Sequence, residues 1–156
     1  MDHESQFIED LNGEDDLGCV IRGHIHVEAE LDNFIQLRTS HPDQLKGADL
    51  TYDQKIHLAL ALGLPTVLKS PLQYLGKVRN SFAHNLNRSI GKEEAGNFYK
   101  TFASEEKEYI NEVIERVNAK TDGPDKKLKT MPVKEQFAMH VISLEASLYS
   151  LNKRVV

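Results

Sequence analysis

Residues 70–84 read SPLQYLGKVRNSFAH and carry the clearest structural signal in the chain. Apolar side chains recur in this stretch at three- and four-residue steps, which is the spacing of one face of an α-helix. Pro71 lies in the first turn, where a helix tolerates proline because the missing N–H would be unpaired there anyway. The stretch therefore predicts a helix that carries Arg79 and turns four apolar side chains toward a core: Leu72, Leu75, Val78 and Phe82.

Helical signals continue along the rest of the chain, and the alternating pattern of a β-strand is almost absent. Asp15 and Asp16 suit a helix N-terminus because their carboxylates interact favourably with the helix dipole. Residues 51–54 have the form of a capping box, and residues 70–73, headed by Ser70, repeat it. The sequence predicts an all-α bundle of about six to seven helices, with the others near residues 7–11, 16–39, 52–62, 92–102, 105–117 and 133–153.

The length of 156 residues is that of one ordinary domain, within which we distinguish four segments. Residues 1–16 form an acidic leader with a short helix, and residues 17–118 form the main bundle. Glycine and proline residues break regular structure in residues 119–132, so this segment is predicted to be a linker. Residues 133–153 form a last helix with an apolar stripe over two heptads. That stripe fits packing on the chain's own bundle or a dimer seam, and we favour the bundle.

Charge is distributed unevenly along the chain. The net charge is −5, but residues 1–16 hold seven acids and no Lys or Arg. Without this leader, 19 basic groups stand against 17 acidic groups, so the acidic total does not exclude an anionic partner. An acidic N-terminus is the reverse of a targeting signal, and no apolar run approaches the roughly 20 residues of a membrane span. We therefore expect a cytoplasmic protein without membrane contact, in which the single Cys19 is a small buried side chain.

Acidic side chains are absent between Asp53 and Glu93. Over residues 54–92 the charged side chains are six Lys or Arg and no Asp or Glu. Arginine offers a planar fork of donors, and histidine can exchange a proton near neutral pH, so such a stretch suits a phosphate. The predicted phosphate- or nucleic-acid-binding residues are Lys77, Arg79, His84, Asn85 and Arg88.

Arg79 and His84 form an Arg-x-x-x-x-His pattern, with the polar Asn80 directly after the arginine. The spacing alone would arise by chance in roughly one such chain in four, so its context matters more. Residues five apart on a continuous helix differ by about 140° around the axis. The pair therefore converges only if the helix bends, ends near Ala83 or meets a second subunit. The plainer interpretation is a solvated or salt-bridged arginine and a histidine favoured by the helix dipole.

If the pattern is catalytic, the chemistry is RNA transesterification without a metal. His84 would act as general base or acid, Arg79 would stabilise the crowded phosphate, and Asn80 would orient them through a hydrogen bond. No His-Glu-x-x-His, Cys-x-x-Cys or glycine-rich phosphate loop occurs, so no metal or other cofactor is predicted. His57 and His140 are expected to be surface or half-buried side chains.

These residues resemble the signature of the HEPN superfamily, all-helical domains marked by Arg-x(4 to 6)-His with a polar residue after the arginine. More narrowly, the chain resembles the mannitol operon repressor family of bacterial proteins. Residues 22–31, 51–64 and 75–85 resemble that family's early helix, the segment before the motif and the motif helix. The resemblance covers about residues 17–105, with looser similarity in the last helix. It implies a dimeric helical bundle in a bacterial cytoplasm.

The superfamily includes RNA-cleaving toxins and defence nucleases as well as branches without shown catalysis, the mannitol regulator among them. Our first hypothesis is a non-enzymatic regulatory protein that acts on transcription through a protein or RNA partner. The second is a metal-independent endoribonuclease that uses Arg79, Asn80 and His84. No helix-turn-helix with a basic recognition helix is visible in the sequence, so direct sequence-specific DNA binding is not expected.

Overall fold

The computed structural model describes residues 2–120 and 122–155, and all regular structure in those ranges is helical, which confirms the predicted all-α bundle. Met1, Thr121 of the predicted linker and Val156 lie outside the described residues. None of the described helices is long and apolar enough to cross a membrane. Seven α-helices and three short 3-10 helices occur in these ranges, slightly more elements than predicted: α1 (His3–Asn12), α2 (Asp16–Leu37), η1 (Pro42–Ala48), α3 (Tyr52–Ala61), η2 (Thr66–Leu68), α4 (Lys69–His84), α5 (Lys92–Thr101), α6 (Ser104–Lys120), η3 (Leu128–Thr130) and α7 (Val133–Lys153).

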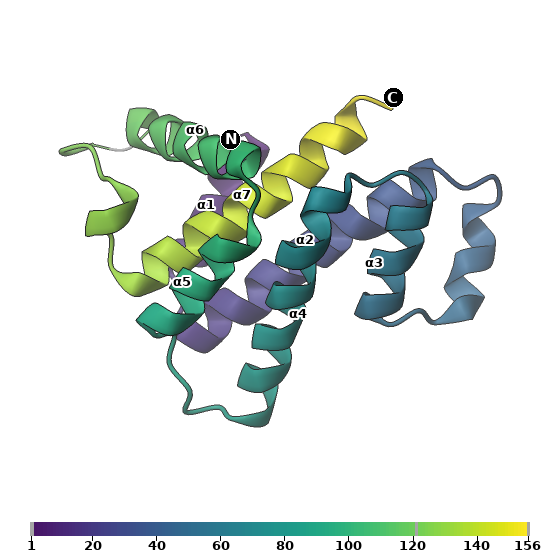
Figure 1. The fold of residues 1–156 in the computed structure, drawn as a ribbon, viewed down its shortest axis with the longest axis horizontal. Coiled ribbons are helices and arrows are strands. Elements are labelled where there is room, and N and C mark those ends of the chain that lie inside the picture. Colours follow the sequence, from purple (N-terminus) through teal and green to yellow (C-terminus); the bar gives the residue numbers. More distant parts are fainter. Residues whose placement is uncertain (1, 121, 156) are drawn as a thin grey trace.

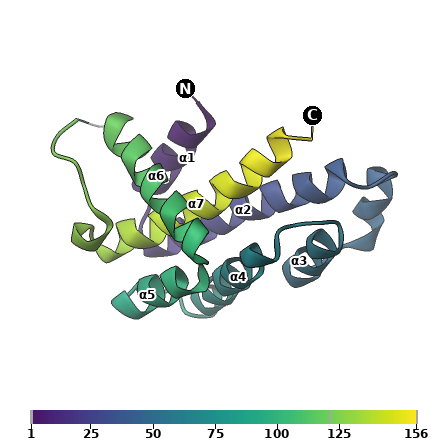
Figure 2. The same ribbon diagram turned by 45° about the horizontal axis from the view of Figure 1, so that its top comes forward.

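The two longest helices, α2 and α7, lie against each other and form the centre of the bundle (Figure 1). The helix α1 contacts both of them, α3 and α4 pack on α2, and α5 and α6 pack on α7. Figure 2 shows α3, α4 and α5 side by side along one edge of the central pair. Gly23 permits a close approach of the central helices, because a Cβ there would lie 2.8 Å from Cγ1 of Val141.

The last helix, α7, is buried along its middle by the five helices that contact it, from Phe137 to Ala146. The side chains of its heptad stripe are fully buried inside the chain at Phe137, Val141, Leu144 and Leu148. The stripe thus packs on the chain's own bundle, which is the alternative that we favour from the sequence. Little of it is left for a dimer seam.

Most helix starts lie where the local sequence predicts them. Asp15 caps α2 by accepting a hydrogen bond of 2.7 Å from a backbone N–H of the first turn, and Thr51 caps α3 in the predicted capping box. The prediction that Ser70 caps α4 is wrong, because α4 begins at Lys69 with Leu68 as its N-cap and no side-chain cap. The turn η2 leads directly into α4, which leaves Ser70 inside the first helical turn.

The segment between α6 and α7 is held partly by a side chain of α6. This helix runs to Lys120 rather than to the predicted end at Val117, so the first part of the predicted linker is helical. The side-chain amide of Asn118 donates a hydrogen bond of 2.9 Å to the carbonyl oxygen of Lys126 across the loop.

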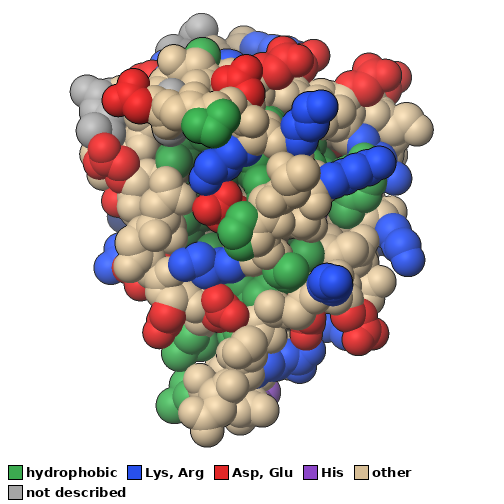
Figure 3. All heavy atoms as spheres, turned by 90° about the vertical axis from the view of Figure 1, so that its left-hand side faces the viewer, with side chains coloured by type: hydrophobic (Ala, Val, Ile, Leu, Met, Phe, Trp, Pro, Cys, Tyr) green, Lys and Arg blue, Asp and Glu red, His purple; other side chains and the backbone are tan. Residues whose placement is uncertain are grey.

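Figure 3 faces this side of the molecule, where Lys and Arg side chains are interspersed with Asp and Glu. Charges of one sign do not gather on the described atoms of this face.

The sequence predicts the burial of Cys19 correctly but not that of His140. Cys19 is fully buried, as predicted, and burial raises the pKa of its thiol to about 12, which keeps it protonated. The prediction that His140 lies at or near the surface is wrong, because its side chain is only 1% exposed. The helix α5 and the residue after it cover this side of α7, and three of their rings surround the imidazole: Phe98, Tyr99 and Phe102.

Candidate phosphate-binding groove

The helix α4 separates its apolar side from a polar side, as its sequence predicts. Leu72, Leu75 and Phe82 are fully buried, whereas Arg79 and His84 are exposed. The helix is continuous from Lys69 to His84. Arg79 and His84 therefore stand about 140° apart around the axis and do not share a face within one chain.

A groove of about 670 Å³ lies where α2, α3 and α4 meet, and we call it the α2–α3–α4 groove. Figure 2 shows α3 and α4 next to each other beside α2. The helix α4 contributes Lys77, Arg79 and Asn80 to its lining, together with Gln73. The opposite lining comes from the start of α3 and from the middle of α2, and includes Thr51, Tyr52, Asp53, His24 and Glu28.

Tyr52 joins the three helices of the groove. Its hydroxyl donates a hydrogen bond of 2.8 Å to the carbonyl oxygen of Leu72 on α4, and its ring lies 4.3 Å from the imidazole of His24 on α2. Gly76 makes this contact possible, because a Cβ there would lie 2.8 Å from the Tyr52 ring. Burial raises the pKa of Tyr52 far above its usual range, so the phenol stays a neutral donor. The groove is therefore a fixed feature of helix packing and not of a loose loop.

Residues 54–92 contain no acidic side chains, but the fold brings acidic side chains from other helices next to them. Lys55 lies 3.0 Å from a carboxylate oxygen of Glu28 and 3.0 Å from one of Asp32, both on α2. Arg88 forms an ion pair of 2.7 Å with Glu94 on α5. These acids come from helices before and after the stretch, so the local count of charges could not reveal them.

Lys77 and Arg79 keep their charge available. Both are exposed, and neither has a carboxylate within ion-pair distance in the part of the chain that the structure describes. Nη1 of Arg79 donates a hydrogen bond of 3.2 Å to Oδ1 of the neighbouring Asn80. Two cations and an amide thus line one side of the groove and can meet an anion.

His24 lies in the groove although the sequence did not single it out. The pKa of His24 is lowered to about 4, mainly by burial; the charge of Glu28 raises it, and the charges of Arg79 and Lys55 contribute to the lowering. Nδ1 of His24 lies 3.6 Å from a carboxylate oxygen of Glu28, one helical turn further along α2. The imidazole is therefore neutral at neutral pH. The spacing of His24 and Glu28 is visible in the sequence, but their proximity to Arg79 depends on helix packing.

The predicted binding residues separate into two groups. Lys77, Arg79 and the predicted orienting residue Asn80 line the groove, whereas His84, Asn85 and Arg88 lie outside it, at the end of α4 and in the loop that follows. Oδ1 of Asn85 accepts a hydrogen bond of 3.2 Å from the backbone of that loop. Arg88 bonds to Ser81 as well as to Glu94. The second group therefore shapes the loop after α4.

Searches with this chain against protein-family models, curated proteins and solved structures give no match. The resemblance to the mannitol operon repressor family therefore rests on the sequence motifs alone, and fold class by itself does not assign an activity.

Proposed function

We propose that this chain is a non-enzymatic regulatory protein of the mannitol-repressor type, which acts on transcription in a bacterial cytoplasm through an RNA partner held in the α2–α3–α4 groove. The observation that carries the proposal is the pair of exposed cations, Lys77 and Arg79, which line the groove and have no carboxylate partner among the described residues. A protein partner is the alternative that the binding test below separates from RNA.

The mixed lining of the groove favours a nucleotide over a bare phosphate ion. Lys77 and Arg79 suit phosphate oxygens, and the side-chain amides of Gln73 and Asn80 can pair with base edges. Glu28 and Asp53 on the opposite side would repel a bare anion but can accept hydrogen bonds from a base or a ribose. The volume of about 670 Å³ falls within the range of small-molecule sites, which is roughly 300–1,000 Å³.

Lys77→Ala and Arg79→Ala are each expected to weaken the binding of single-stranded RNA roughly tenfold at low salt, because each removes a charge-assisted contact to a phosphate. Each substitution should also lower the steepness with which affinity falls with salt, by about one unit of the logarithmic slope. Fluorescence anisotropy with a labelled single-stranded RNA of mixed sequence, titrated at several salt concentrations, measures both quantities.

Lys100→Ala is the matched control for this experiment, since Lys100 is exposed on α5 and does not line the groove. It should bind RNA like the unmodified protein. Equal weakening in all three variants would mean diffuse attraction without a site at the groove. If the unmodified protein binds no RNA at all, the RNA partner is wrong.

A metal-independent endoribonuclease is the second candidate function. The hydrogen bond between Arg79 and Asn80 favours it, since it places the two predicted polar groups together. The predicted Arg79 and His84 pair could act only if a second copy of the chain brought its His84 to Arg79. Such a homodimer would not use the buried stripe of α7, but Leu86, which follows α4 and is 71% exposed, offers an apolar contact near His84.

A mixing experiment tests the nuclease with an RNA substrate in EDTA. Arg79→Ala and His84→Ala should each abolish cleavage by the unmodified protein if both residues act. When the two variants are mixed, each mixed dimer contains one intact Arg79 and His84 pair, so roughly a quarter of the activity should return. Cleavage that Arg79→Ala abolishes and His84→Ala leaves intact would place the reaction within one chain, where His24 is the histidine on the groove. Cleavage that both substitutions abolish and that does not return on mixing would contradict the shared site between two chains. Inert unmodified protein would eliminate the nuclease.

A further inference from the structure

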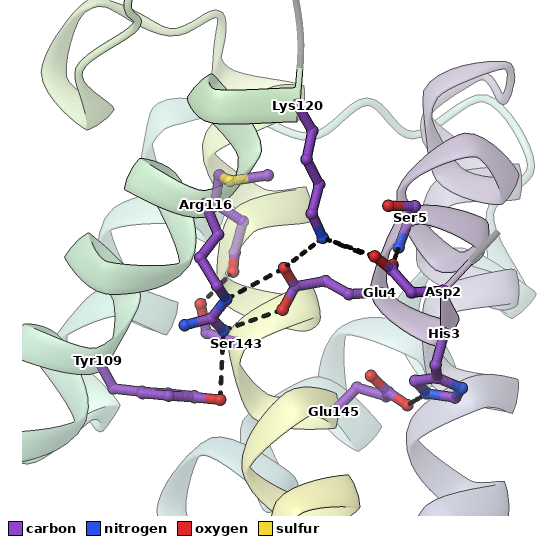
Figure 4. A network of polar contacts seen from close by, with 10 residues as sticks. Asp2, His3, Glu4, Ser5, Tyr109, Arg116, Lys120, Ser143 and Glu145 are labelled. Atoms are coloured by element: carbon purple, nitrogen blue, oxygen red, sulfur yellow. Dashed lines mark hydrogen bonds and ion pairs between the residues drawn. The ribbon is translucent and has the colours of Figure 1, made fainter.

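Three ionisable side chains from three helices meet beside α1, and none of them lines the α2–α3–α4 groove. They are His3 of α1, Glu30 of α2 and Glu145 of α7, and each offers a ligand atom within 4.8 Å of the other two. Glu30 and Glu145 are 8% and 1% exposed. Figure 4 shows the imidazole of His3 directed at the carboxylate of Glu145, to which it is hydrogen bonded. We call these three residues the His3 cluster.

The His3 cluster holds more negative charge than its neighbours balance. The imidazole is hydrogen bonded to Glu145, while the carboxylate of Glu30 accepts from the amide of Asn152. A buried carboxylate is costly unless an opposite charge or hydrogen bonds compensate it. Two of the nearby cations are used elsewhere: Arg116 donates to Glu4 at 2.9 Å, and Lys120 lies 3.2 Å from Asp2 and 3.4 Å from Glu4 (Figure 4). The third, Lys153, lines the same cavity as His3, and its ammonium lies 5.1 Å from the centroid of the Tyr149 ring. A further positive charge would therefore fit at the cluster.

Asn152 supplies an independent sign that a group is expected there. Its amide nitrogen donates to the carbonyl oxygen of Glu30 at 2.9 Å and to the carboxylate of Glu30 at 2.8 Å, so the side chain lies directly against the cluster. Asn152 is only 6% exposed, and its Oδ1 is buried without a hydrogen-bond partner within the described structure. Buried polar atoms are nearly always paired, and an amide oxygen is also a metal ligand.

We propose that His3, Glu30 and Glu145 bind a divalent transition-metal ion of the Zn²⁺ type. One imidazole nitrogen and two carboxylate oxygens are ligands that Zn²⁺ accepts, whereas Mg²⁺ and Ca²⁺ prefer oxygen alone. Three protein ligands leave a fourth position for water. The ion would join α1 to the central pair of helices, so its first effect is on stability.

The geometry needs one local adjustment to hold the ion. Tetrahedral ligands with bonds of about 2.0–2.2 Å lie roughly 3.4 Å apart, so His3 and Glu145 must separate from their present hydrogen bond. His3 can move, because its side chain is 36% exposed and its ring stacks on that of Tyr149, with ring centroids 4.0 Å apart. A cavity of about 410 Å³ that His3, Glu145 and Tyr149 line gives the ion a path from solvent.

Titration of the metal-stripped full chain, carrying no affinity tag, with Zn²⁺ tests the proposal. Isothermal calorimetry should give one ion per chain, and Co²⁺ in its place should show the d–d absorption bands of a low-symmetry site. His3→Gln and Glu145→Gln should each weaken Zn²⁺ binding by at least tenfold. Zn²⁺ should also raise the melting temperature of the unmodified protein and not that of His3→Gln.

His57→Gln is the matched control, since His57 is an exposed histidine whose Nδ1 lies 3.5 Å from a carboxylate oxygen of Asp53. It should bind Zn²⁺ like the unmodified protein. His3 lies at the edge of the cluster, so its variant keeps the test valid if Glu145→Gln does not fold. Zn²⁺ binding that His3→Gln leaves unchanged, or the absence of stoichiometric binding, would overturn the site. In that case His3 and Glu145 share a proton in place of an ion.

Discussion

Phe98→Ala is expected to lower the free energy of unfolding by about 3–5 kcal/mol, which is the usual cost of removing a buried phenylalanine ring. Phe98 is fully buried on α5. Its ring centroid lies 5.5 Å from that of Tyr74 on α4 and 5.1 Å from that of Phe137 on α7. Because one ring joins three helices, the neighbours cannot all close the cavity that its removal leaves, and the upper part of the range is expected.

Urea unfolding followed by circular dichroism measures this loss by linear extrapolation to water. Leu86→Ala is the control, since Leu86 is also a large apolar side chain but is 71% exposed after α4. Its effect should stay within about 0.5 kcal/mol. A loss below about 1 kcal/mol for Phe98→Ala would contradict the packing of α5 between α4 and α7.

The helices could be predicted from the sequence because their signals are local. Apolar side chains at three- and four-residue steps predict a helix wherever they occur, and Thr51 forms a capping box with Gln54, three residues further on. The last helix has the predicted bounds for the same reason. Ser70 fails as a cap because the competing signal is tertiary: η2 packs Leu68 into the core and starts α4 early.

The candidate groove could be predicted only on its α4 side. Lys77, Arg79 and Asn80 lie within four consecutive residues of the sequence, so a pattern could identify them. His24 joins them through the packing of α2 on α4, and no local spacing reports that contact. Charges behave in the same way, since Glu94 reaches Arg88 from α5. A count of charges over one stretch of sequence therefore does not predict the charge of the folded surface around that stretch.

The sequence does not predict the His3 cluster, because only helix packing brings its three residues together. Metal motifs are recognised by short spacings on one helix or loop, whereas His3, Glu30 and Glu145 come from the beginning, the first third and the end of the chain. Glu30 and Glu145 also look like ordinary solvated helix residues in the sequence. Their burial follows from the central position of α2 and α7, which only the order of helix packing determines.

The stability of the protein is expected to fall by about 3 kcal/mol through His140 alone as the pH is lowered from about 6.5 to about 4. Burial lowers the pKa of His140 to about 4, and a hydrogen bond with the backbone of Ala95 only partly opposes it. Nδ1 of His140 has no hydrogen-bond partner in the described structure. At a pH between the two pKa values, the imidazole of His140 is protonated in the unfolded chain and neutral in the folded chain. The contribution is therefore fully present above pH 6.5 and is lost as the pH falls to the folded-state pKa.

His140→Phe isolates this contribution, because phenylalanine keeps an aromatic ring beside Phe98 and Phe102 but does not titrate. Two other groups also change stability over this range. The pKa of His24, lowered to about 4 mainly by burial, adds a loss of the same sign, whereas burial raises the pKa of Glu145 to about 7 and gives a gain as the pH falls. Both groups remain in the variant, so subtracting its pH profile from that of the unmodified protein cancels them.

Chemical unfolding at half-unit steps between pH 4 and pH 7.5 gives the two profiles. The unmodified protein should lose about 3 kcal/mol more than His140→Phe across this range, whatever offset the larger ring causes at pH 7.5. His57→Phe, the same substitution at an exposed position on α3, should follow the unmodified profile. Parallel profiles for His140→Phe and the unmodified protein would mean that the protonated imidazole reaches water or a partner. That outcome would contradict the enclosure of His140 by Phe98, Tyr99 and Phe102.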